Sequence, residues 1–161
     1  MESFENGSGA DSPSSSVHAY GGSAAVCLSD STTRKGRSTV ALEFARSLSP
    51  GTYDWSTKVA FQLTQGELAE ATAFLFFPWG RQRWIHGQGQ AKKEVVLEDQ
   101  QTHILFACQT KGDRLRVPVV PRDAYYFRNF LLARLLVSQP DLPGPWQLRS
   151  LEILARQSSL E

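Results

Sequence analysis

The sequence predicts an α+β fold of two similar halves, each an antiparallel sheet followed by a helix, with the helices packed at the centre of a homo-oligomer. Apolar and polar residues alternate in several segments between 24 and 120, as expected for strands that bury one face. Helical patterns follow these strands twice, after residue 64 and after residue 121. The length of 161 residues and the 41% hydrophobic content fit one domain with its own core.

The first half is predicted to begin near Tyr20. Its helix begins with a capping box, in which the Thr64 side chain accepts from the Glu67 backbone N–H and the Glu67 carboxylate reaches back to Thr64. Pro78 ends this helix. The strands expected before it cover residues 24–28, 38–45 and 58–63.

The second half repeats this order. Its helix is predicted from Pro121 to Val137, with Pro121 suited to the first turn and Asp123 placed where the helix dipole favours an anion. The four strands expected before it cover residues 81–86, 94–97, 103–108 and 115–120.

Two flanking segments differ from this domain, which is predicted to span residues 20–138. Residues 1–19 are rich in Ser and Gly and carry three acidic and no basic side chains, so they are predicted to be a disordered acidic tail. Residues 139–161 form a Pro-rich linker and a short helix with Leu148, Leu151 and Leu154 in register. This helix is expected to dock on the domain or on a partner.

The helix after Pro121 is apolar around most of its circumference, and such a helix must be buried on all sides. A second copy of the chain is the favoured cover, and folding of the carboxy-terminal segment over the helix is the alternative. The residues expected at the oligomer interface are Phe127, Phe130, Leu131, Leu132 and Leu135.

Catalytic, cofactor and metal-site motifs are not found in this sequence, and we expect neither an enzyme nor a bound cofactor or metal. No apolar run is long enough to span a membrane. The two cysteines, Cys27 and Cys108, lie far apart in the sequence and suggest a reducing, cytoplasmic location.

Several segments resemble, in order, the Whirly family of single-stranded DNA-binding proteins, as a bacterial-type member. The most specific one contains Tyr53-Asp54-Trp55, and the resemblance covers residues 20–138. The matching segments are 51–67, 83–86, 92–98, 106–109 and 117–119. Gly21 and Ser23 stand where the family has lysines, and the stretch after Leu28 is shorter than the family's, which predicts a first sheet that is smaller or differently paired.

The resemblance implies a homotetramer that binds single strands between protomers, DNA more than RNA and with little sequence preference. Such binding needs cations for phosphates and flat surfaces for bases. Trp55 and Trp84 have core burial as their alternative, and the arginines an ordinary solvated face. The candidate nucleic-acid-binding residues are Lys35, Arg37, Trp55, Lys58, Arg81, Arg83, Trp84, Lys92, Lys93, Arg114 and Arg116.

A different function remains open at this point. An oligomeric scaffold or transcription-regulatory protein could use the carboxy-terminal segment to bind a protein partner.

Overall fold

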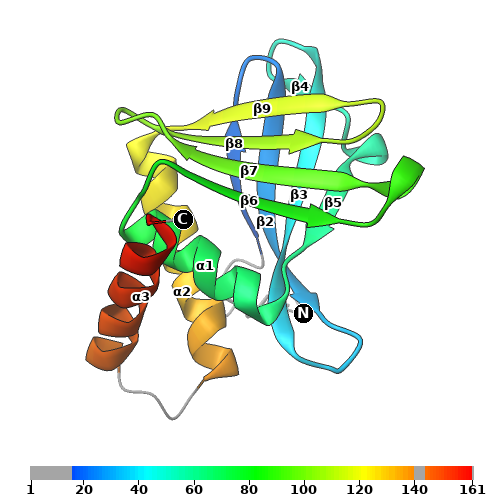
Figure 1. Cartoon of the computed structure of the whole chain (residues 1–161). Coiled ribbons are helices and arrows are strands. Elements are labelled where there is room, and N and C mark those ends of the chain that lie inside the picture. Colours follow the sequence, from blue (N-terminus) through cyan, green and yellow to red (C-terminus); the bar gives the residue numbers. More distant parts are fainter. Residues whose placement is uncertain (1–15, 140–143, 161) are drawn as a thin grey trace, which may run out of the picture.

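Two antiparallel sheets cross over a shared core, and the helices gather at one end of them (Figure 1). The computed structural model describes residues 16–139 and 144–160. None of the helices in these segments is both long and apolar enough to cross a membrane.

The first sheet is larger than the sequence indicated. Its central strand β3 pairs with β2, β4 and β5, and β1 extends the sheet beyond β2. Strand β2 continues through the polar residues after Leu28 by pairing with β3 as far as Thr32–Ser38. The strands are β1 (Ser16–Tyr20), β2 (Ala24–Thr32), β3 (Ser38–Ser49), β4 (Thr52–Tyr53) and β5 (Val59–Gln62), with a short 3-10 turn η1 at Trp55–Thr57.

The start of β1 corrects the boundary of the predicted tail. Residues 16–19 belong to a strand that pairs with β2, so this part of the predicted tail lies in the folded domain. Ala19 is buried and Val17 packs against the core, which stabilises an otherwise polar segment. The rest of the predicted tail, residues 1–15, lies outside the described residues.

The second sheet confirms all four predicted strands. They lie in sequence order, each antiparallel to the next. The turn after β6 contains Gly87 with a φ of 76°, and a Cβ there would lie 2.6 Å from the Ala91 carbonyl oxygen, so the turn requires glycine. The strands are β6 (Arg81–His86), β7 (Lys93–Asp99), β8 (Ile104–Gln109) and β9 (Arg114–Val119), with a 3-10 turn η2 at Gly89–Ala91.

Helix α1 (Gln65–Phe76) begins as predicted, but half of its capping box is used differently. The Thr64 hydroxyl accepts from the Glu67 backbone N–H at 3.2 Å. The Glu67 carboxylate oxygens lie 2.6 and 2.8 Å from Nε2 of His86 on β6, not at the Thr64 backbone. The His86 ring also stacks on Phe61 of β5 at 3.8 Å between centroids. This cluster therefore joins the first helix to both sheets.

Helix α2 (Pro121–Ser138) is buried differently from the prediction. Phe127, Phe130, Leu131 and Leu135 are at most 5% exposed within a single chain, because α1 and the first sheet cover them. The inference that their burial requires sister chains is therefore wrong. Leu132, the fifth residue expected at an interface, remains partly exposed.

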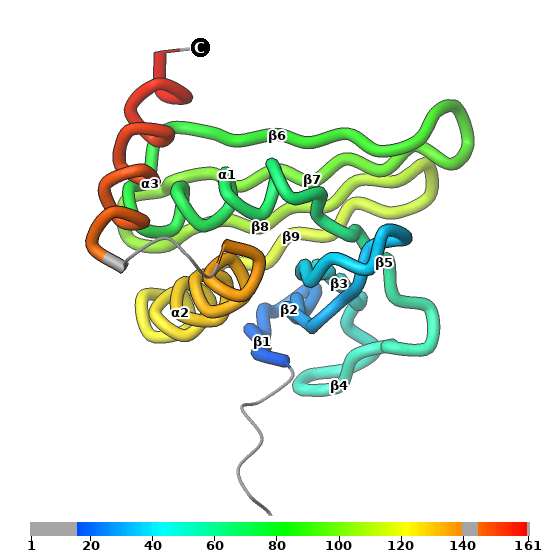
Figure 2. Tube along the Cα trace, turned by 90° about the horizontal axis from the view of Figure 1, so that it is seen from below, coloured from blue at the N-terminus to red at the C-terminus, as the bar shows by residue number. Residues whose placement is uncertain are grey.

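Helix α3 (Gly144–Ser158) docks on the domain, one of the two outcomes expected for it. Figure 2 shows α1 and α2 side by side and α3 on the outer side of α1. Leu151 and Ala155 are buried in this contact, whereas Leu148 is 39% exposed. The buried face is thus rotated from the predicted leucine stripe, and α3 does not cover α2 as the alternative had it.

We predict that Thr64→Ala lowers the free energy of unfolding by about 1 kcal/mol, because the Glu67 N–H loses its hydrogen-bond acceptor. Urea denaturation followed by circular dichroism measures this. Thr64→Ser keeps the hydroxyl and is expected to unfold near the wild-type midpoint. Equal stability of the alanine and serine variants would contradict a capping role.

Candidate nucleic-acid interface

The outer face of the second sheet carries most of the candidate cations. Strand alternation and register decide which side chains share this face, because successive residues point to opposite sides. Most inward positions are apolar and pack into the core. The outward residues, in rows across the four strands, are Arg81, Glu98, Leu105 and Pro118; Arg83, Val96, Ala107 and Arg116; Ile85, Glu94, Gln109 and Arg114.

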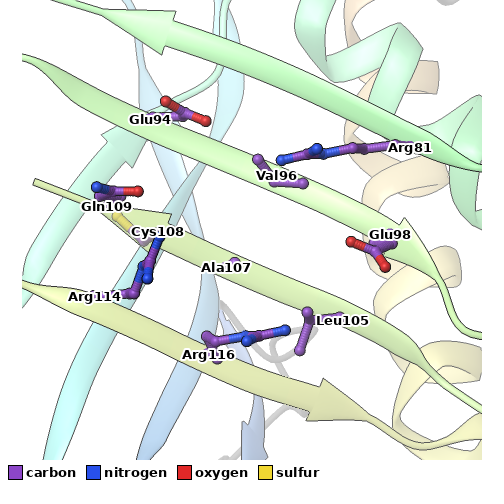
Figure 3. Close-up of a pocket in the computed structure, with 10 residues that line it drawn as sticks. All are labelled: Arg81, Glu94, Val96, Glu98, Leu105, Ala107, Cys108, Gln109, Arg114 and Arg116. Atoms are coloured by element: carbon purple, nitrogen blue, oxygen red, sulfur yellow. The ribbon is translucent and has the colours of Figure 1, made fainter.

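A hollow of about 230 Å³ lies in the middle of this face (Figure 3). Val96, Leu105 and Ala107 form its apolar floor. Arg81 extends over Val96 and Arg116 runs along β9 toward Leu105. The floor can receive a flat apolar group, and the arginines can meet anions beside it.

The arginines on this face fall into two groups. Arg83 donates to both carboxylate oxygens of Glu94, at 2.8 and 3.0 Å, and this hydrogen bonding holds the pKa of Glu94 below its ordinary value. The guanidinium groups of Arg81, Arg114 and Arg116 form no hydrogen bond or ion pair with any residue that the structure describes. These three guanidinium groups are therefore free to bind an anion, whereas Arg83 would first have to leave Glu94.

The two lysines of the β6–β7 turn have different surroundings. Lys92 lines a second hollow together with Lys111, and this hollow shares Glu94 and Gln109 with the first. The cationic surface thus continues from the hollow to this turn. Lys93 instead donates to the Ala60 carbonyl oxygen at 2.8 Å and helps hold β5. Lys111 is missing from the candidate list, although its place in a turn between two strands was a usable signal.

Trp84 does not belong to the site. It is 6% exposed and points into the core, on the opposite face of β6 from Arg81 and Arg83. Its indole Nε1 has no hydrogen-bond partner among the described residues. The placement of Trp84 in a nucleic-acid site is wrong, because strand alternation buries it.

Trp55 and Lys58 lie on the first sheet, in a separate aromatic cluster that the sequence did not indicate. The His18 ring is 5.6 Å from Trp55 and 5.8 Å from Tyr20, and Tyr20 is 5.4 Å from Tyr53. The Lys58 ammonium is 2.8 Å from a Glu43 carboxylate oxygen, so its charge is offset. This surface therefore combines aromatic rings with a lysine, Lys58, whose charge is already paired.

Lys35 and Arg37 are exposed in the turn between β2 and β3 and line neither hollow of the second sheet. No group of three His, Cys, Asp or Glu side chains within residues 16–139 and 144–160 could hold a metal ion.

Comparison with solved structures identifies this architecture. The structure of the plant transcriptional regulator PBF-2 matches with a TM-score of 0.62 and 17% identity, over 78% of this chain and 82% of that one. The structure of WHY3 from Arabidopsis thaliana matches with a TM-score of 0.61 and 17% identity, over 91% and 96%. WHY1 from Arabidopsis thaliana matches with a TM-score of 0.59 and 18% identity, over 76% and 89%.

The chain has the Whirly fold. The predicted α+β class with two antiparallel sheets and helices is confirmed. No protein-family model matches the sequence, and no curated protein matches it. The sequence identity to these structures is only 17–18%, and it is the similarity of the backbones that shows the fold.

Within the Whirly fold both cysteines lie on strands of the sheets. Burial raises the pKa of the Cys108 thiol to about 11. Burial and the nearby Glu43 carboxylate raise the pKa of Cys27 to about 11 as well. Both thiols are therefore protonated near neutral pH.

We predict that iodoacetamide at pH 8 labels both cysteines slowly in the folded protein and rapidly in urea. The raised pKa lowers the thiolate population at pH 8 about a hundredfold, since the thiolate is the nucleophile. Mass spectrometry over time measures the labelling. Folded-state labelling as fast as that in urea would contradict the burial of both thiols.

Proposed function

We propose that this chain binds single-stranded nucleic acid, DNA more than RNA, on the outer face of its second sheet and without catalysis. The observation that carries this proposal is the set of three unpaired guanidinium groups, Arg81, Arg114 and Arg116, around an apolar floor. Cations beside an apolar surface are what unpaired bases on a charged backbone require. The Whirly fold, shared with a plant transcriptional regulator, agrees with this assignment.

The charge of the face favours phosphates over other ligands. It carries four arginines and two glutamates, a net charge of +2, whereas the whole chain has a formal net charge of +1. Lys92 and Lys111 add charge at one end. Backbone contacts of this kind do not read sequence, so binding is largely sequence-tolerant and weakens with salt.

The shape of the face favours single strands over duplex. The major groove of DNA admits a helix or a two-stranded ribbon. The outer face of the second sheet is four strands wide, which is too wide to enter that groove. A single strand can lie across such a sheet with its bases turned toward the apolar floor.

The proposed assembly is a homotetramer, as the resemblance to the Whirly family implies. Most of the α2 residues first expected at its interface are buried within the chain, so we place the interface on the exposed side of the same helix. Tyr125, Tyr126 and Val137 are 54%, 57% and 65% exposed there, and Leu132 lies partly exposed between them. These exposed side chains share their side of α2 with exposed Arg122 and Asn129, and together they offer a mixed apolar and polar surface for contact with another chain. We place the activity in cytoplasmic DNA maintenance, repair or transcription.

A protein-binding scaffold is the second candidate function. Trp146 and Ile153, seven residues apart on α3, share one helix face and are 66% and 43% exposed. This face is apolar and points away from α1, so it could receive a partner helix. Binding of a labelled oligonucleotide distinguishes the two candidates, since the scaffold requires none.

We predict that replacing Arg114 and Arg116 together by Gln weakens binding of a dT16 oligonucleotide and lowers its salt slope by about 1.4. Each lost contact to a single strand removes about 0.7 from the slope of log K against log salt. Fluorescence anisotropy at several salt concentrations measures it. The matched control is Arg149→Gln with Arg156→Gln on α3, whose partner is Glu152 and which should leave the slope unchanged. Equal competition by duplex DNA would contradict the proposed substrate.

We predict that Tyr126→Asp dissociates the homo-oligomer while the chain stays folded. The substitution places a charge in an apolar contact that the folded monomer leaves open. Light scattering coupled to gel filtration measures the mass, and Leu48→Asp, at a position 63% exposed on β3, is the control. Leu131→Asp should instead unfold the chain, because Leu131 is 1% exposed. A wild-type mass of one chain would contradict the assembly.

A further inference from the structure

The hollow on the second sheet exists because a small residue stands among large ones. Ala107 pairs with Val96 on β7 and with Arg116 on β9, and its outward neighbours along β8 are Leu105 and Gln109. A methyl group at this position leaves space that a larger side chain would fill. The resulting volume of about 230 Å³ is just below the range of about 300–1,000 Å³ of sites for drug-sized ligands. It fits one planar base.

The rim of the hollow places a hydrogen-bond donor next to an acceptor. Arg81 and Glu98 are directly opposite each other on β6 and β7, yet they form no ion pair. Glu98 accepts one long hydrogen bond, from Gln100 Nε2 at 3.4 Å, so its carboxylate can accept more. Glu94 differs, because Arg83 occupies both of its oxygens.

This pattern distinguishes the four bases. A carboxylate only accepts, and guanine is the base whose pairing edge offers it two adjacent donors, N1–H and N2–H₂. The neighbouring O6 of guanine accepts from a guanidinium, as arginine does in DNA recognition. Adenine and cytosine offer a single amino group, and thymine offers one N–H between two carbonyl oxygens, which Glu98 would repel.

We infer that the hollow is a subsite for one guanine base of the bound strand. Glu98 accepts from N1–H and N2–H₂, Arg81 donates to O6, and the ring lies on Ala107 and Leu105. Arg114 and Arg116 remain for the phosphates. This subsite rests on the proposed single-strand binding and adds a preference at one nucleotide to contacts that are otherwise sequence-tolerant.

The test compares the binding of 16-nucleotide probes in lithium chloride, which disfavours guanine quadruplexes. The probes alternate thymine with guanine, hypoxanthine, adenine or cytosine, and dT16 is the reference. We expect the guanine probe to bind about five- to tenfold more tightly than dT16, the lower end of the discrimination of a bidentate pair. The hypoxanthine probe, which lacks the N2 amino group, should fall between guanine and adenine.

Two variants remove the preference by different routes. Ala107→Leu fills the hollow without changing charge. Glu98→Gln replaces one of the two acceptor oxygens by an NH₂ donor, so the side chain can no longer accept from both guanine donors. Both should reduce the guanine preference to less than twofold while dT16 still binds. The matched controls are Ala60→Leu, at an exposed alanine on the first sheet, and Glu152→Gln on α3; both should keep the preference.

The outcomes separate this inference from the proposed function. If dT16 binds with salt dependence but the guanine probe binds no better, the subsite is refuted and single-strand binding stands. If the preference persists in both Ala107→Leu and Glu98→Gln, guanine is bound elsewhere and the subsite is also refuted. If no probe binds with salt-dependent affinity, the proposed function itself fails.

Discussion

Both sheets bury one face in a single apolar core, and this shared burial determines which residues lie on the outer face of each sheet. Phe44 and Phe61 contribute to it from the first sheet, and Phe106 of the second sheet meets Phe127 of α2 edge to face at 5.5 Å. Because side chains alternate along a strand, fixing the inward residues also fixes the outward ones. The residues of the candidate site therefore alternate along each strand with residues of the core.

Much of the fold followed from local signals in the sequence. The second sheet, both main helices and the Thr64 cap were predictable, because alternation, helical period and capping act over a few residues. Strand β1 was not, since Ser16–Tyr20 is short, follows a Ser-rich segment and becomes a strand by pairing with β2. The burial of α2 was misjudged for a related reason. Its cover comes from α1 and from the strands of the first sheet, which lie far from it in the sequence and which helical periodicity does not reveal.

The site was predictable in composition but not in detail. Alternation already placed Arg81 and Arg83 on one face and Trp84 on the other, but it did not show which face the core would cover, and Trp84 proved to be buried. The difference between the two arginines depends on cross-strand pairing. Glu94 binds Arg83 from a diagonal position, while Glu98, directly opposite Arg81, leaves it unpaired. The sequence alone does not distinguish these arginines. The strand register shows which of them are paired with a carboxylate and which are available to a ligand.

The two outer faces show how the same core can support surfaces of different chemistry. On the first sheet Lys58 is matched by Glu43, and aromatic rings dominate beside them. On the second sheet β9 alternates Leu115, Val117 and Val119 inward with Arg114 and Arg116 outward. A one-residue slip of β9 would expose the three apolar side chains and bury two guanidinium groups, which is prohibitively costly without partners. The burial that stabilises the fold therefore also keeps Arg114 and Arg116 on the outer face, and no further interaction is required to keep them there.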